Sequence, residues 1–166
     1  MTNEKLHVIL ATALDKAGSN RTLAGHIMKR YALAQALIIE EEFSEEDIAV
    51  LLAATILYDF NDAKANPTDD PNKEFKPIVI TNYITELLEE LYLPTFEVSA
   101  IGSLVAMQKH GLKIENKLHR LLVDIQTLVT LDDQPEPTKE QILTARDTMT
   151  YDSAKHRLNL MFNINE

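Results

Sequence analysis

Three ionisable residues that could do chemistry lie inside apolar, helix-like segments of the chain. His26 stands in TLAGHIMKRYALAQALII, Asp59 follows LLAATILY, and Asp124 lies in LHRLLVDIQTLVTL. A buried carboxylate must be paired, hydrogen-bonded or bound to a metal, because leaving it charged and alone costs several kcal/mol or more. Two carboxylates and one imidazole in such surroundings therefore predict one shared polar site.

The elements that must position these residues are predicted to be helices. Glycine is scarce, with four residues, and no long stretch alternates strictly between apolar and polar side chains. Apolar residues recur instead at three- and four-residue spacing, which favours an all-α, single-domain helical bundle of about six to seven helices. We expect helices over about residues 3–16, 21–42, 45–59, 77–92, 95–110 and 114–131, and a C-terminal helical extension over 138–162.

Short sequence signals indicate where several of these helices begin and end. Gly18 and the two residues after it break the first helix, and Ser44 followed by Asp47 is typical of a helix N-cap. Thr138 with Gln141 matches the capping-box pattern that opens the last helical region. The Asn-, Asp- and Pro-rich segment between the third and fourth helices is the longest predicted loop.

Composition narrows the classes of protein to which the chain could belong. A length of 166 residues with 45% apolar content fits one globular domain, residues 1–166, and the absence of cysteine excludes thiolate chemistry. A net charge of −10 argues against a nucleic-acid partner, which calls for clustered Lys and Arg. The apolar run 48–57 is about half the length of a membrane span, and residues 1–10 lack a signal-peptide pattern. We therefore expect a cytoplasmic protein without a membrane partner.

The spacing of the three ionisable residues resembles that of the HD superfamily of metal-dependent phosphohydrolases. There, a helix bearing a His is followed by an apolar helix that ends in His-Asp, and GHIMKRYALAQALIIEEEFSEEDIAVLLAATILYDF has a similar layout. KPIVITNYITELLEELYLPTFEVSAIGSLVAMQKHGL resembles the middle helices of the family, and LHRLLVDIQTLV resembles its final metal-ligand helix. The likeness covers about residues 5–131.

The resemblance implies a ligand set and a reaction. His26 matches the first His of the family pattern, Asp59 the Asp of the His-Asp pair, and Asp124 the last Asp. These three would hold one divalent ion such as Mg²⁺ or Mn²⁺, which polarises a phosphoryl oxygen and activates a water for attack on phosphorus. His110 and Lys76 would face the phosphate of a nucleotide or another small phosphoester, so that Asp59, His110 and Lys76 are the predicted catalytic residues.

The family pattern is incomplete at two positions. Tyr58 stands where the metal-binding His of the His-Asp pair should be, and Lys76 occupies a place where members with two metals carry another His. A phenol with an ordinary pKa near 10 is a poor anionic ligand at neutral pH. If the Lys76 ammonium reached Asp59 or Asp124, it would supply the positive charge that a metal otherwise provides. The second hypothesis is therefore a catalytically inactive HD-like pseudoenzyme that binds a ligand or a protein.

Simpler interpretations stay open beside these two. His26 could be a partly buried histidine bonded to a backbone carbonyl, and Asp59 could be a turn or capping residue at a helix end. A calcium loop beginning at Asp59 is disfavoured, because Lys64 stands where the loop requires Gly and no Glu closes it. A third hypothesis is an unrelated helical adaptor, in which the matching spacings are coincidence. A homodimer is the common default for a domain of this kind.

Overall fold

The chain folds as an all-α bundle. The computed structural model describes residues 1–60, 82–109 and 116–164, and these contain eight α-helices, one short 3-10 helix and no strand. None of the helices in these ranges combines the length and the hydropathy that a membrane crossing requires. In chain order the elements are α1 (Asn3–Ala17), α2 (Arg21–Ile38), α3 (Glu45–Leu57), the 3-10 helix η1 (Tyr58–Phe60), α4 (Asn82–Glu90), α5 (Thr95–Lys109), α6 (Lys117–Asp132), α7 (Lys139–Thr148) and α8 (Asp152–Phe162).

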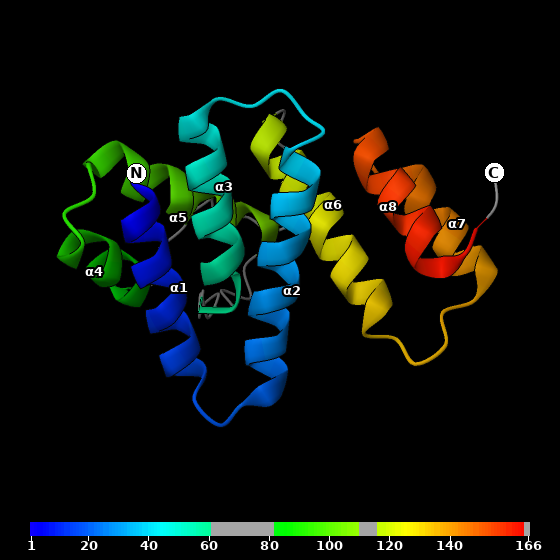
Figure 1. Cartoon of the computed structure of the whole chain (residues 1–166), viewed down its shortest axis with the longest axis horizontal. Coiled ribbons are helices and arrows are strands. Elements are labelled where there is room, and N and C mark those ends of the chain that lie inside the picture. The colour runs from blue at the N-terminus through cyan, green and yellow to red at the C-terminus, as the bar shows by residue number, and fades with distance from the viewer. Residues whose placement is uncertain (61–81, 110–115, 165–166) are drawn as a thin grey trace, which may run out of the picture.

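Helix α3 forms the centre of the core. All its residues from 50 to 57 are buried, and it packs against α1, α2, α5 and α6. Figure 1 shows it between α1 and α2, with α5 behind. The apolar sequence of residues 48–57, on nearly all sides of the helix, is typical of a helix buried on most sides, and the structure agrees. Each fully buried Leu or Ile side chain stabilises the fold by about 1.5–3 kcal/mol, so α3 holds the surrounding helices together.

The predicted capping residues set the helix ends in the structure. Ser44 Oγ accepts a hydrogen bond from the Asp47 N–H at 3.1 Å at the start of α3. At the start of α7, Thr138 Oγ1 accepts from the Gln141 N–H at 3.2 Å, while Gln141 Oε1 accepts from the Thr138 N–H at 2.8 Å. Gly18 follows α1 with φ +52°, a backbone conformation that glycine adopts at little cost. Short-range chemistry thus fixes these ends.

Two helix boundaries differ from the expectation. Helix α2 ends at Ile38, four residues before the predicted end at residue 42. The single C-terminal helical region is two helices, α7 and α8, separated at residues 149–151, where the sequence has neither Gly nor Pro. The predicted loop 61–73, the first residues of the predicted fourth helix and the predicted cap Gly111 lie outside the described residues.

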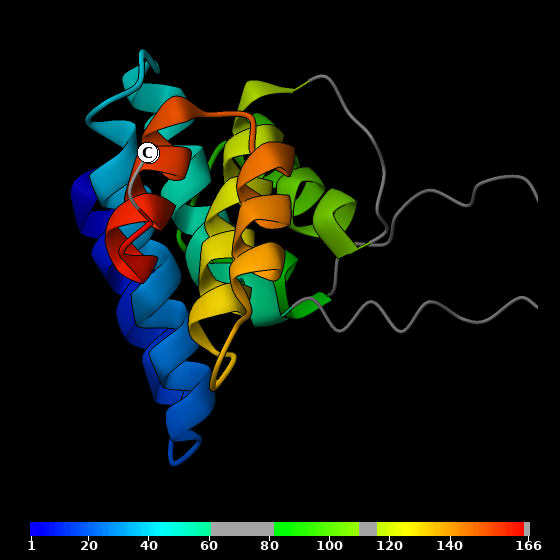
Figure 2. The same ribbon diagram turned by 90° about the vertical axis from the view of Figure 1, so that its right-hand side faces the viewer.

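Helix α6 has neighbours on two sides. Helices α2, α3 and α5 pack on one side, and α8, which carries α7, packs on the other. Figures 1 and 2 place α7 and α8 together at one side of the bundle, next to α6, and α8 also reaches the segment after α2, where Ser153 Oγ donates to Glu41 Oε1 at 2.6 Å. Side chains on α6 therefore meet different surroundings according to the direction in which they project.

Candidate functional site

His26, the first predicted ligand, pairs with a carboxylate at the end of α6. His26 Nε2 lies 2.7 Å from Asp133 Oδ2, and both side chains are about one third exposed, at 31% and 33%. Lys29, on the same side of α2, lies 2.7 Å from Asp133 Oδ1 and 2.6 Å from Asp132 Oδ2. Burial alone would raise the pKa of Asp133, but the Lys29 hydrogen bond and the nearby charges of His26 and Lys29 outweigh it and lower that pKa. This is a partly solvated ion cluster.

Asp59, the second predicted ligand, binds a guanidinium. Asp59 Oδ2 accepts a hydrogen bond from Arg30 Nη2, and the two groups form an ion pair. Arg30 projects from α2 and is 1% exposed, whereas the Asp59 side chain is 25% exposed. The short helix η1, which follows α3, contacts α2 and so brings Asp59 to this arginine.

The remaining contacts of Arg30 come from two further helices. Its Nε donates to the backbone carbonyl of Thr55 at 3.3 Å, and its Nη1 donates to Gln126 Oε1 at 3.3 Å. The guanidinium carbon also lies 4.7 Å from the centre of the Tyr58 ring, in a cation–π contact. We call Arg30 with Thr55, Tyr58, Asp59 and Gln126 the Arg30 centre. Because arginine keeps its charge at every accessible pH, this centre holds a permanent positive charge against Asp59.

Asp124, the third predicted ligand, caps a helix. It is 1% exposed, and its Oδ2 accepts from the backbone N–H groups of Thr150 at 3.0 Å and Tyr151 at 2.9 Å. These amides immediately precede α8, and Tyr151, at the N-cap position, makes no capping bond of its own. The Asp124 carboxylate therefore satisfies the start of α8 from a different helix, at the positive end of the helix dipole. Burial raises the pKa of Asp124, and the two backbone hydrogen bonds offset this only in part.

The structure thus gives each predicted metal ligand a separate partner. Asp124 and Gln126 are two positions apart on α6, so their side chains project about 200° apart around the helix. Asp133 lies roughly two and a half turns beyond Asp124, or about 13 Å along the axis. Within the described ranges, no group of three or more His, Asp or Glu side chains is placed to hold a metal ion.

The single shared polar site of the sequence analysis is therefore three separate sites in the described part of the chain. As arranged, His26 pairs with Asp133, Asp59 pairs with Arg30, and Asp124 accepts from the amides that precede α8. Lys76 and His110 lie outside the described residues, so their predicted catalytic role stays a prediction. Metal binding by His26, Asp59 and Asp124 likewise stays a prediction.

Arg30 was not among the residues predicted from the sequence, although a signal was present. The apolar stripe of α2 includes Ile27 and Ala34, and Arg30 occupies the helical position between them, where an apolar residue would be expected. All three are buried. A cation in an apolar stripe requires a partner just as a buried carboxylate does. Considering both signs of charge together would have suggested the pair with Asp59.

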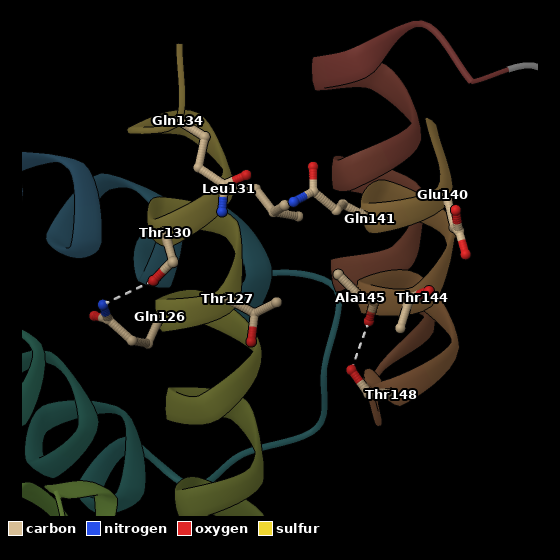
Figure 3. Close-up of a pocket in the computed structure, with 10 residues that line it drawn as sticks. All are labelled: Gln126, Thr127, Thr130, Leu131, Gln134, Glu140, Gln141, Thr144, Ala145 and Thr148. Atoms are coloured by element: carbon tan, nitrogen blue, oxygen red, sulfur yellow. Dashed lines mark hydrogen bonds between the residues drawn. The ribbon is translucent and has the colours of Figure 1, made fainter. Parts of the chain in front are cut away.

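A groove with a volume of about 480 Å³ lies between α6 and α7, next to the Arg30 centre. Residues 126–134 form one wall and residues 140–148 form the other (Figure 3). Gln126 belongs to both features, because its Oε1 accepts from Arg30 while its Nε2 donates to Thr130 Oγ1 at 3.2 Å in the groove. The Arg30 centre thus fixes one of the polar groups that the groove presents.

The chain matches no protein-family model, no curated protein and no solved structure at a significant level of similarity. The HD-type resemblance consequently rests on the spacing and apolar context of its residues. The function must be argued from the contacts of the Arg30 centre and from the groove beside it.

Proposed function

We propose that this chain is a metal-free helical binding module of HD-like layout, and that it does not hydrolyse phosphoesters. The observation that carries the proposal is the contact between Arg30 and Asp59. A guanidinium beside the carboxylate provides the positive charge that a divalent ion would provide in a hydrolase. Lys76 is the source of this charge that the sequence suggests, and among the described residues Arg30 provides it.

A divalent ion at Asp59 would share the carboxylate with the guanidinium or displace it, because Asp59 Oδ2 is bonded to Arg30. Like charges repel at short range, so the ion and Arg30 would compete for one carboxylate. Arg30 is 1% exposed and is also held by Thr55 and Gln126, and a buried charge deprived of its partner costs about 3–5 kcal/mol. Metal binding at this position would therefore have to overcome the stability of the core.

The other two predicted ligands support the same proposal. Both Asp124 oxygens lie within hydrogen-bonding distance of the Thr150 N–H, and Oδ2 also accepts from Tyr151, so an ion there would remove the cap of α8. His26 Nε2, one of the two nitrogens that could bind a metal, is directed at Asp133. The competing proposal, the metal-dependent phosphohydrolase that the family resemblance implies, needs all three contacts to rearrange.

Metal content and metal titration separate the two proposals. For protein purified without chelators, we expect well under one transition-metal ion per chain by mass spectrometry, and no saturable Mn²⁺ binding by calorimetry. Replacing Arg30 with Met and Tyr58 with His together should create measurable Mn²⁺ binding, since it removes the competing charge and adds the missing imidazole. The matched control is Glu46→Gln, which removes an exposed charge on α3 and should change nothing.

The hydrolase proposal makes the opposite prediction. One tightly held ion per native chain, together with turnover of nucleotides or p-nitrophenyl phosphate that Asp59→Ala abolishes and Glu46→Gln preserves, would overturn the binding-module proposal.

A further inference from the structure

The groove between α6 and α7 is rich in uncharged hydrogen-bonding side chains. Seven of its ten lining residues are Thr or Gln, and Glu140 is the one charged residue among them. A quarter of the chain is charged, so a wall of hydroxyls and amides with one carboxylate differs from the rest of the surface. No Lys, Arg or His lines the groove, and the chain carries a net charge of −10. The groove is therefore unsuited to an anion such as a phosphate.

The Arg30 centre determines which hydrogen-bond donors and acceptors one side of the groove offers to a ligand. Because Gln126 Oε1 accepts from Arg30, the amide nitrogen must be the atom that faces Thr130, and it donates to Thr130 Oγ1. The Thr130 oxygen is thus used as an acceptor, and its hydroxyl proton is available to a ligand. The bond to Arg30 thus fixes the orientation of the Gln126 amide, and the Gln126 amide in turn orients the Thr130 hydroxyl as a donor.

Three further polar groups of the groove are also oriented by bonds within the protein. Thr127 donates to the Val123 carbonyl at 2.9 Å, and Thr148 donates to the Ala145 carbonyl at 2.8 Å, so both oxygens keep lone pairs for a ligand donor. Gln141 Oε1 is used by the capping box of α7, which leaves its NH₂ group as a donor. The groove therefore offers donors from both walls and acceptors from both walls.

Apolar surface separates these donors and acceptors. Leu131 and Ala145 line the groove, and Figure 3 shows Leu131 and Gln141 projecting toward each other across it. The volume of about 480 Å³ falls within the roughly 300–1,000 Å³ typical of sites for small organic molecules. A planar group that has one donor and one acceptor at its edge, and apolar faces, matches this arrangement. An amide has an N–H donor and a carbonyl acceptor side by side at its edge.

We propose that the groove binds an uncharged small molecule that carries a carboxamide or cyclic-amide group. This inference names the ligand class of the binding module and so rests on the proposed function. The ligand's carbonyl accepts from the Gln141 amide or the Thr130 hydroxyl, its N–H donates to Thr127 or Thr148, and its apolar faces contact Leu131 and Ala145. A carboxylate of the same shape lacks the N–H donor and brings a negative charge toward Glu140.

Matched pairs of small probes test the inference. Nicotinamide and nicotinate, and uracil and orotate, should be titrated separately into the ¹⁵N-labelled full chain while amide chemical shifts are recorded. We expect nicotinamide and uracil to shift the amides of residues 126–134 and 140–148 in a saturable way. Nicotinate replaces the amide of nicotinamide by a carboxylate, whereas orotate keeps the cyclic amide of uracil and adds a carboxylate, so orotate tests the negative charge alone. Each should bind at least tenfold more weakly than its neutral partner. Equal binding of the carboxylates, or no saturable shift in either wall with the neutral probes, would overturn the inference.

A variant that preserves the helix cap shows whether the groove itself binds the probe. Gln141→Glu keeps an acceptor for the Thr138 N–H, because Glu serves equally in a capping box, but it removes the NH₂ donor and adds a charge. It should weaken nicotinamide binding tenfold or more. The control Gln35→Glu makes the same chemical change on the exposed face of α2, outside the groove, and should bind as the native chain does. Equal losses in both variants would contradict the assignment.

Two further measurements keep the outcomes distinct. If the groove is instead covered by a second copy of the chain, its amide shifts will depend on protein concentration without any probe, and sedimentation will show a dimer, which would overturn the small-molecule inference. A metal-free protein whose groove binds no neutral probe refutes this inference alone. A native chain that holds one metal ion and turns over phosphoesters refutes the proposed function, whatever the probes do.

Discussion

Two buried charges, Arg30 and Asp124, are equally removed from solvent but are satisfied in different ways. Arg30 has an opposite charge, two oxygen acceptors and an aromatic ring around it. Asp124 accepts from two backbone N–H groups and forms no ion pair with any cation in the described part of the chain. The guanidinium stays ionised at all accessible pH values, whereas burial raises the pKa of Asp124 and so favours its neutral form. A permanent charge needs a partner of opposite sign, but an acid can also accommodate burial by taking up a proton.

Asp59→Ala should have the largest effect on stability. It leaves the buried Arg30 charge without its carboxylate, and breaking a buried pair in this way costs about 3–5 kcal/mol. Urea unfolding followed by circular dichroism measures the change. The double variant Arg30→Met with Asp59→Ala should recover a large part of the loss, because no unpaired charge remains. A double variant as unstable as the sum of the two single variants would show that the residues are not energetically coupled.

Asp124→Ala should come next. It leaves the N–H groups of Thr150 and Tyr151 without their acceptor at the start of α8, and loss of a helix N-cap acceptor costs about 0.5–2 kcal/mol. Asp124→Asn keeps one acceptor oxygen without the charge, so its cost should be clearly smaller. Amide hydrogen exchange locates the effect, with faster exchange in α8 than in α3 for the alanine variant. Uniform acceleration across all helices would argue against a local capping role.

Stability as a function of pH should distinguish Asp124 from Asp133, the two acids at opposite parts of α6. The pKa of Asp124 is raised above its ordinary 3.8, so its contribution to stability is greatest below that pH and is lost as the pH rises through the raised value. Asp133 has a lowered pKa, since Lys29 and His26 outweigh its burial. Its contribution is present above pH 3.8 and is lost as the pH falls through the lowered value.

The measurement is a set of urea titrations between about pH 3 and pH 7, the range in which acids of this kind titrate. Relative to Asp124→Asn, the native chain should lose stability as the pH rises. Relative to Asp133→Asn, it should gain stability over the lower part of the range. Slopes of the same sign for the two comparisons would show that one of the two environments is described incorrectly.

The sequence predicted most helices because their signals are local. The buried helix α3, the Ser44 cap and the capping box of Thr138 and Gln141 depend on residues close in the chain, and each is confirmed. The break between α7 and α8 was missed because its cause is not local. The acceptor for the amides of residues 150 and 151 is Asp124, more than two dozen residues earlier.

The sequence identified the unusual acids but not their partners. Burial of Asp124 is confirmed. Whether Asp124 shares a site with Asp59 depends on the direction in which its side chain projects from α6. A side chain on α6 can face α8 or the Arg30 centre, and spacing along the chain does not decide between them. The groove had no sequence signal at all, because Thr and Gln at helical spacing are ordinary surface residues until two helices place them opposite each other.

The contacts of Arg30 also constrain the order in which the chain can fold. Thr55 and Asp59 are 25 and 29 residues away in the chain, but Gln126 is 96 residues away. A guanidinium gives up its bound water at low cost only when protein acceptors replace that water. Arg30 can therefore bind Thr55 and Asp59 early, but it becomes fully buried only when α6 packs against it. Docking of α6 and closure of the core around Arg30 are then a single late event in folding. Helices from both halves of the sequence should accordingly unfold together rather than in turn.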